Sequence, residues 1–255
     1  MHYSMLTHTL LASLTLFTTL TTAFPYHLLD PRELAIPGPP SDPPKAATGD
    51  GIGPYGNESA GVTDYAAWAE YETIAETAAS IGLVHAAAHL EHYLGNTGSD
   101  YNDSPETMMN DLPKFRDAAK ALAQNEAAAA WNRILDASGE LAFSSTWSGF
   151  YAEKDQSMDW YYSVGGFSFA VTGVVSKNGQ SGSLRYKIHV FDRYNWDDGK
   201  STTIGPFTFY DRDLGSLHLK GLAREYIVRG SGGVNTVTDF KATTVIPPPS
   251  TGGRS

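Results

Sequence analysis

The sequence predicts an α+β fold, in which an N-terminal helical half is followed by an antiparallel β meander with one short helix near the C-terminus. Two observations carry this prediction. Between about residues 63 and 136 the composition is rich in alanine and favours helix, whereas apolar and polar side chains alternate in the segments 167–172 and 184–190. Helices that precede the strands, instead of alternating with them, are typical of α+β domains.

The helical half is expected to contain one long helix and two further ones. Thr63 is suited to be the N-cap of the long helix, which continues past Gly82 to about Leu94. Pro105 marks the first turn of a short helix, and Pro113 opens a third through the alanine-rich stretch.

In the β half, the alternating segments 167–171 and 184–190 flank the turn-forming sequence KNGQSG and predict an antiparallel hairpin with one buried face. Further strands are expected near 141–152, 158–164, 203–210 and 224–229. Asp211 is suited to cap a short helix that ends near Leu222.

The composition excludes several classes of protein. The chain has no cysteine, which rules out a disulfide-stabilised miniprotein, thiol catalysis and cysteine-ligated metal sites. A formal net charge of -10 disfavours non-specific binding of nucleic acid, because that binding needs clustered Lys and Arg. The sequence also lacks a P-loop, a dinucleotide fingerprint, a GxSxG elbow and an HExxH helix, so we expect no cofactor with a recognisable motif.

The N-terminus predicts secretion. Residues 1–23 contain a mainly apolar run that ends in small residues, with Thr21 and Ala23 at the -3 and -1 positions of a signal-peptidase site. We therefore expect a cleaved signal peptide, an extracellular protein and no stable membrane insertion; a membrane anchor is the alternative. Asn57 and Asn102 begin N-glycosylation sequons and are expected to be exposed.

Composition also suggests the domain organisation. Residues 24–62 are rich in proline and glycine and are interpreted as a linker or pro-segment. Residues 63–246 are expected to form a single α+β domain, and residues 247–255 a disordered tail.

Three polar motifs are candidates for a site. In the first, His85, His89 and His92 fall within about 60° of one another on one helical face. Buried, hydrogen-bonded histidines, a catalytic histidine (His92) and a metal-binding pair are the three interpretations of this face, and we assign no metal ligand.

The second motif is the loop that follows the buried strand 184–190. Its aromatic and polar side chains suit ligand binding, with Asp192 as a candidate catalytic residue. The candidate binding residues are Tyr194, Asn195, Trp196, Asp197 and Lys200. The alternatives are a turn in which Asp and Asn bond backbone amides, and a calcium site that departs from the EF-hand pattern.

The third motif is the segment Asp211–Tyr226. On a continuous helix, His218 and Glu225 would lie two turns apart on one face and would form an acid/base or orienting pair. A histidine that is simply hydrogen-bonded in the core is the alternative.

Four stretches resemble parts of one domain: HLEHYLGNTG from His89, WYYSVGGFSFAVTG from Trp160, HVFDRYNWDDGKSTTIG from His189 and LHLKGLAREY from Leu217. Over about residues 85–230 the chain resembles an uncharacterised domain at the C-terminal ends of secreted actinobacterial proteins with WXG-type N-terminal helices. That position behind a secretion module implies a toxin-like role. The resemblance carries no catalytic residues with it.

Taken together, these features favour a secreted toxin-like effector that acts on a competitor or host. As a hydrolase it would use His92 or His218 as general acid or base, oriented by Asp192, Asp197 or Glu225. The alternative is a non-catalytic secreted protein that binds a cell-wall glycan or a surface protein. The partner is expected to be a component of the target cell, whether glycan, protein or nucleic acid.

Overall fold

The computed structural model describes residues 33–45, 51–197, 199, 201–204 and 207–252. The chain divides into two units, Met1–Glu33 and Leu34–Ser255, and the description below concerns the second. The predicted signal peptide and Lys200 lie outside the described residues.

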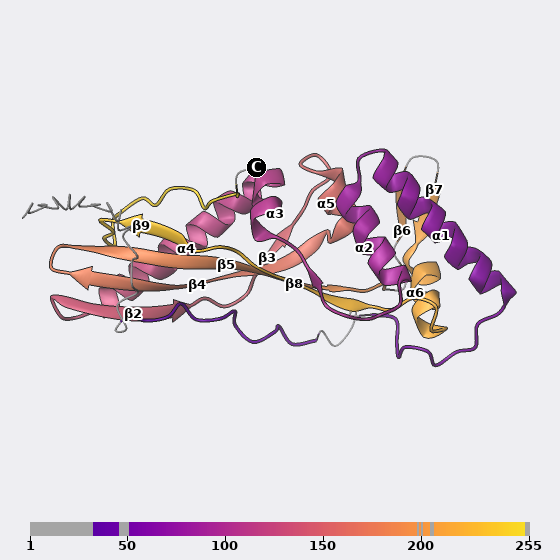
Figure 1. Ribbon diagram of the computed structural model, residues 1–255, viewed down its shortest axis with the longest axis horizontal. Helices are drawn as coiled ribbons and strands as arrows, with labels where there is room; N and C mark the ends of the chain where they lie inside the picture. The colour runs from indigo at the N-terminus through magenta and orange to yellow at the C-terminus, as the bar shows by residue number, and fades with distance from the viewer. Residues whose placement is uncertain (1–32, 46–50, 198, 200, 205–206, 253–255) are drawn as a thin grey trace, which may run out of the picture. The chain divides into compact units, whose positions relative to one another are not determined.

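The fold is α+β, as predicted. The helices are α1 (Val62–Ser80), α2 (Val84–Leu94), α3 (Pro105–Asp111), α4 (Pro113–Arg133), α5 (Met158–Ser163) and α6 (Asp211–Leu219). The strands are β1 (Tyr101–Asn102), β2 (Ser138–Ser144), β3 (Ser148–Tyr151), β4 (Gly166–Asn178), β5 (Ser181–Tyr194), β6 (Ser201–Ile204), β7 (Phe207–Tyr210), β8 (Tyr226–Ser231) and β9 (Asn235–Thr238). Figure 1 shows their arrangement.

The predicted hairpin forms the centre of the main sheet. Ser168–Asn178 of β4 pairs with Ser181–Phe191 of β5, and Gly179 takes a φ of 62° in the turn that joins the two strands. The strand order is β1-β8-β5-β4-β2, with β3 also pairing with β4 and β9 with β5. The β1–β8 pair is parallel, and β6 and β7 form a separate two-stranded sheet.

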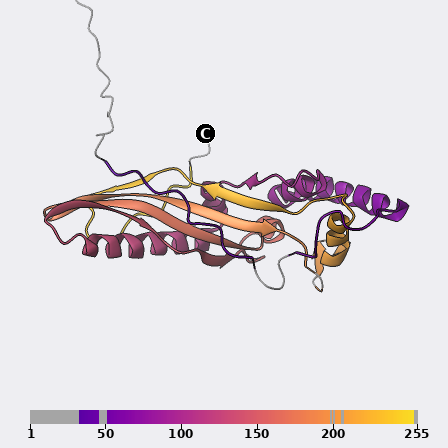
Figure 2. The same ribbon diagram turned by 90° about the horizontal axis from the view of Figure 1, so that it is seen from below.

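One face of the central hairpin packs against α4, which lies along the sheet at the end where β2 and β9 are found (Figures 1 and 2). We call this the core face. On α4, alanines recur at three- or four-residue spacing, and small side chains let a helix approach a sheet closely. These buried alanines are Ala119, Ala123, Ala127 and Ala130, and β5 faces them with Leu184, Tyr186 and Ile188.

A second core lies at the other end of the sheet, where α1, α2 and α6 are found (Figure 1). Tyr194 of β5 and Tyr226 of β8 are paired residues whose rings stack at a centroid distance of 4.8 Å. Tyr93 of α2 packs on the same ring of Tyr194 and donates a hydrogen bond of 2.8 Å to the Leu214 carbonyl of α6. This core therefore ties both helices to the ends of β5 and β8.

The expectation of a single buried face is wrong for the middle of β5. His189 and Phe191 point away from the core face, yet they are 1% and 3% exposed. They are covered because the proline-rich segment runs in extended form across this second face. We call residues 34–45 and 51–58 the strap, and the face beneath them the strap face.

The strap is held mainly by hydrogen bonds to its backbone. The Leu34 carbonyl accepts from Arg185, and the Pro37 carbonyl accepts from Thr172 at 2.8 Å. Further along, the Ser41 carbonyl accepts from the Trp147 indole at 2.8 Å. The linker or pro-segment interpretation of residues 24–62 stays a prediction, but within it residues 34–45 are docked on the sheet.

Local structure departs from the predictions in the helical half. The long helix breaks into α1 and α2 at Gly82, whose φ of 90° no helix accepts. Helix α1 also begins earlier than expected, with Gly61 in place of Thr63 as its N-cap. The break lets α2 fold back against α1.

A second departure concerns residues 158–164, where a strand was predicted. Helix α5 forms there because Ser157 caps it, accepting the Trp160 N–H at 3.2 Å. Burial of Trp160, which is 1% exposed, overrides the strand preference of the aromatic run.

Candidate functional site

The end of β5 and the loop after it lie between two cavities. Arg193, Tyr194 and Asn195 line both of them. The first cavity, about 350 Å³, contains His218 and Glu225, and we call it the His218 cavity. The second, about 520 Å³, is lined by several tyrosines, and we call it the tyrosine cavity.

His218 and Glu225 meet in the His218 cavity, but not as the sequence predicted. Helix α6 ends at Leu219, and Gly221 turns the chain with a φ of 69°. The two residues therefore do not share a helical face. Instead the turn brings the Glu225 N–H to His218, where it donates a hydrogen bond of 3.1 Å to Nδ1.

The hydrogen bonds define the tautomer of His218. Because Nδ1 accepts from a backbone amide, the proton of the neutral imidazole lies on Nε2. That Nε2–H donates to the carbonyl of Gly53 in the strap at 3.1 Å. Nε2 also lies 3.9 Å from Oε2 of Glu225.

Burial shifts both groups toward their neutral forms. It raises the pKa of the Glu225 carboxyl above its ordinary value, although backbone N–H groups of Trp196 and Ile52 oppose the shift. It lowers the pKa of the His218 imidazole, and the Gly53 carbonyl opposes that shift. A buried acid and imidazole with shifted pKa values in one cavity are typical of acid–base sites.

Cationic side chains surround this pair. Lys45, Arg193 and Arg224 line the His218 cavity together with the single carboxylate of Glu225. The Arg224 guanidinium stacks over the ring of Tyr55 at 4.7 Å, and Arg193 donates a hydrogen bond to the Pro43 carbonyl. The excess of positive charge suits an anionic ligand.

The tyrosine cavity has different chemistry. Among its lining residues are Tyr151, Tyr161 and Tyr162, next to carboxylates that include Asp192 and Asp197. Among the residues that the structure describes, two buried polar atoms of this cavity have no hydrogen-bond partner, namely Oγ of Ser163 and Nε1 of Trp196. Buried polar groups are nearly always paired, so these two atoms mark places where a ligand would supply the missing bonds.

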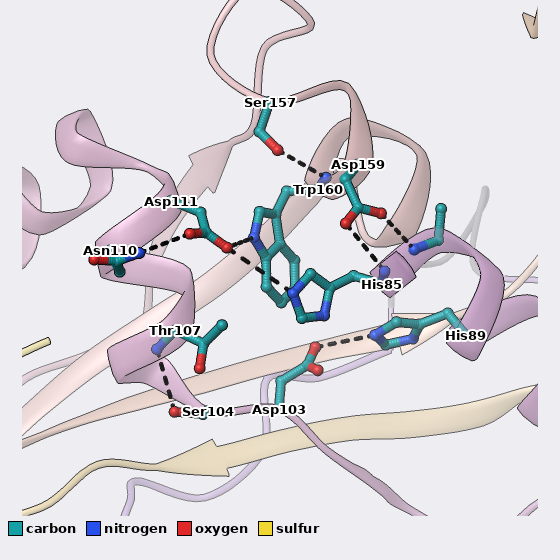
Figure 3. Close-up of polar contacts among 11 residues, drawn as sticks. His85, His89, Asp103, Ser104, Thr107, Asn110, Asp111, Ser157, Asp159 and Trp160 are labelled. Carbon is teal, nitrogen blue, oxygen red and sulfur yellow. Dashed lines mark hydrogen bonds and ion pairs between the residues drawn. The ribbon is translucent and has the colours of Figure 1, made fainter. Parts of the chain in front are cut away.

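The three histidines of α2 lie in separate environments and not at one centre. His85 stacks on Trp160 at a centroid distance of 4.1 Å, and its Nε2 is 3.9 Å from Asp111 (Figure 3). The carboxylate of Asp159 accepts the N–H groups of His85 and Ala86 at the N-terminus of α2. These contacts fasten α2 to α5 and indicate a structural role for His85.

His89 is fully buried. Its Nε2 lies 3.1 Å from the Asp103 carboxylate (Figure 3), and its Nδ1 lies 2.7 Å from the Tyr226 hydroxyl. The Tyr226 hydroxyl also donates to the His89 carbonyl at 3.0 Å. Both ring nitrogens are thus satisfied inside the second core.

His92, a candidate catalytic residue, lines neither cavity. Its Nε2–H donates to the Ser99 carbonyl at 2.8 Å, and its ring packs edge-on against Tyr101 and Tyr226. Among the described residues, no three His, Asp or Glu side chains are grouped so as to hold a metal ion.

The structure therefore brings together one part of the predicted site. His218, Glu225, Tyr194 and Asn195 line the His218 cavity, whereas Asp192, Trp196 and Asp197 line the tyrosine cavity. The Trp196 N–H donates to Oε1 of Glu225 at 3.3 Å and so connects the two groups. The sequons begin at exposed residues, Asn57 and Asn102.

Sequence reasoning missed the strap side of the site. Lys45, Gly53 and Tyr55 lie in a segment whose composition indicated a linker, and no periodic pattern marks residues that dock through their backbone. Arg193 and Arg224 were within candidate motifs but were not selected. The sequence did contain a signal for Arg193 as a site residue, because it directly precedes the candidate Tyr194 at the end of a buried strand.

Comparison with known proteins leaves the family open. No protein-family model matches the chain, the segment 85–230 included. No curated protein matches it in sequence. One solved structure is similar in part: PaeM, a colicin M-like bacteriocin produced by Pseudomonas aeruginosa, with 18% identity and a TM-score of 0.34 over 60% of this chain. The match spans about half of the bacteriocin chain, 49%.

Proposed function

We propose that this protein is a secreted toxin-like hydrolase that acts on an anionic component of a target cell. The observation that carries the proposal is the His218–Glu225 pair, whose Nε2 and Oε2 lie 3.9 Å apart in a cavity with three cationic side chains. Secretion is supported by the predicted signal peptide, and the toxin-like role by the resemblance of residues 85–230.

We assign different roles to the two side chains. Glu225 is the general base: its carboxylate accepts a proton from an attacking water, and its raised pKa makes it a stronger base than an ordinary carboxylate. His218 presents Nε2–H, because its Nδ1 is occupied by the Glu225 amide. That N–H donates to the oxygen on which negative charge develops.

The cationic residues select the substrate. Arg193 and Arg224, which lie outside the strap, present planar guanidinium groups that bind carboxylates or phosphates through paired hydrogen bonds. An anionic group held between them lies next to the water that Glu225 activates. We therefore expect esters or amides adjacent to a phosphate or carboxylate to be cleaved.

Glu225→Gln is expected to lower turnover at least about 100-fold, because it removes the base and keeps the side-chain volume. His218→Asn is expected to have a similar effect. The measurement is the release of soluble fragments, detected by mass spectrometry, from isolated bacterial and fungal cell envelopes, RNA and protein. In the wild type the rate should rise with pH through the raised pKa of Glu225, above 4.5.

Asp213→Asn is the matched control. Asp213 is an exposed carboxylate on α6 that lines neither cavity, so its loss should leave turnover unchanged. Measurable turnover that is equal in the wild type, E225Q and H218N would remove the His218 cavity from consideration as a catalytic site.

A second candidate function is glycan binding in the tyrosine cavity. Tyrosine faces stack on the C–H faces of sugars, while carboxylates and amides bond the hydroxyl groups. The specific observation in its favour is the pair of unpartnered buried atoms, Ser163 Oγ and Trp196 Nε1. Such a protein would bind without turnover.

Tyr151→Ala and Tyr161→Ala are each expected to weaken glycan binding about tenfold, through loss of one stacking contact. Calorimetric titration with N-acetylglucosamine oligomers and with soluble peptidoglycan fragments measures this effect. The control is Tyr65→Ala, which removes a tyrosine of α1 that is 58% exposed and outside the cavity. If neither probe binds the wild type, or all three variants bind alike, the glycan hypothesis fails.

A further inference from the structure

We propose that the strap is a built-in inhibitory segment, which closes the His218 cavity in the resting protein and must be displaced before the cavity can act. Its regulatory meaning rests on the function proposed for that cavity. Displacement of the strap itself is measurable without any turnover.

The strap occupies the groups that a substrate would need. The Gly53 carbonyl takes the Nε2–H of His218, which is the donor that the proposed chemistry requires. Glu225 is covered at the same time: a Cβ added at Gly51 would come within 2.7 Å of its Oε2. The strap thus lies against both members of the pair.

Contacts on either side of Gly53 hold this closure in place. The Gly51 N–H donates to Asp197 at 3.0 Å, and the Gly56 and Glu58 N–H groups donate to the last carbonyls of α6 at 3.0 and 2.9 Å. The Tyr55 ring packs edge-on against His218 at a centroid distance of 5.5 Å.

The contacts that attach the strap to the sheet are of a kind that can break without unfolding the rest of the domain. None of residues 34–45 is buried, so release of this part exposes little apolar surface of its own. Its prolines lack an N–H, and its carbonyls accept hydrogen bonds from side chains of β4, β5 and the β2–β3 loop, and not from a strand ladder. Segments with few buried apolar contacts and exposed hydrogen bonds open without global unfolding.

Asp42 is the side-chain anchor of the strap. Its carboxylate pairs with both Nη atoms of Arg229 in β8, at 2.5 and 2.8 Å. Arg229 also donates from Nε to Asp100 at 2.6 Å, and Asp100 lies outside the strap. The chain therefore offers a matched pair of substitutions on one guanidinium.

Asp42→Ala tests the proposal, with Asp100→Ala as its control. The readout is the rate of histidine modification by diethyl pyrocarbonate, followed residue by residue by mass spectrometry. Asp42→Ala is expected to raise the rates at His218 and His189, both beneath the strap, about tenfold, since a bidentate charged pair is lost. Asp100→Ala should leave both rates as in the wild type.

Two other histidines make the result interpretable. His92 is half-buried and serves as an internal standard for the activity of the reagent. Its modification rate should therefore be equal in the wild type and both variants. His89 of α2 is fully buried, and its rate should rise only on global unfolding. Equal His218 rates in the wild type and both variants would overturn the proposal, because the strap would then be a permanent part of the domain.

If Asp42→Ala does not fold, native-state hydrogen exchange of the wild type tests whether the strap opens locally. The amides of Gly51, Gly56 and Glu58 are expected to exchange at least about 100-fold faster than the paired amides of β4 and β5. Equal protection of the strap and the sheet would also overturn the proposal. Faster histidine modification without any turnover would count against the hydrolase alone.

Discussion

Asp103→Ala is expected to lower the free energy of unfolding by about 3 kcal/mol, because it leaves the fully buried His89 without its partner at Nε2. The His89 side chain is 0% exposed and the Asp103 side chain 5%, so the contact is shielded from solvent. Urea unfolding at neutral pH, followed by tryptophan fluorescence, measures the change.

Asp100→Ala serves again as the control. Like Asp103, Asp100 is next to β1 in the sequence and pairs with a basic side chain, here Arg229. Its own side chain, however, is 54% exposed. Its ion pair is expected to contribute less than about 1 kcal/mol. Asp103→Asn should lie between the two, because an amide oxygen still accepts from Nε2. Equal losses for Asp103→Ala and Asp100→Ala would show that the buried contact adds nothing to stability.

Acidification is expected to destabilise the protein through His189. Burial lowers the pKa of this imidazole to about 4, from an ordinary value of 6.5, and Lys187 adds to the shift. The neutral ring is linked to the strap, because Nε2 lies 2.9 Å from Thr172 Oγ1, which donates to the Pro37 carbonyl. Its Nδ1 lies 2.8 Å from the Ser231 hydroxyl.

The sign follows from the lowered pKa. Above pH 6.5 His189 is neutral in both the folded and the unfolded chain, and its contribution to stability is complete. Between pH 6.5 and about 4 the unfolded chain binds a proton that the folded chain does not, so about 2–3 kcal/mol is lost across this window.

His189→Gln isolates this contribution from those of other titrating groups. The difference in unfolding free energy between pH 7 and pH 4.5 should be smaller in this variant by about 2 kcal/mol. Thermal unfolding at both pH values checks the result in wild type and variant. An unchanged pH dependence would mean that His189 does not titrate across the window.

The sequence was sufficient for the central hairpin and most helices. Alternation in 167–171 and 184–190 identified β4 and β5, because side chains on one face of a strand repeat every two residues. The Ser-Pro pair at 104–105 correctly placed α3, since a serine N-cap and a proline in the first turn are local features. Both signals act within a few residues.

The sequence was insufficient to predict local structure and site geometry where contacts between distant residues determine them. Residues 158–164 read as a strand but form α5, because Trp160 gains the Asp111 carboxylate and the His85 ring as partners. His218 and Glu225 were both identified as candidates, but their actual contact runs through a turn at Gly221. Helical periodicity placed His218 and Glu225 together on the assumption of one continuous helix. The two residues are close, but because of a turn and not because they share a helical face.

By itself, the sequence determined the α+β class, the β4–β5 hairpin and the residue types available for a site, because propensity, alternation and capping act locally. Only the tertiary structure decided that a proline-rich segment covers the second face of β5 and that Gly53 bonds His218. The strap docks through backbone carbonyls, which every residue carries. Its docking therefore leaves no pattern of side chains in the sequence.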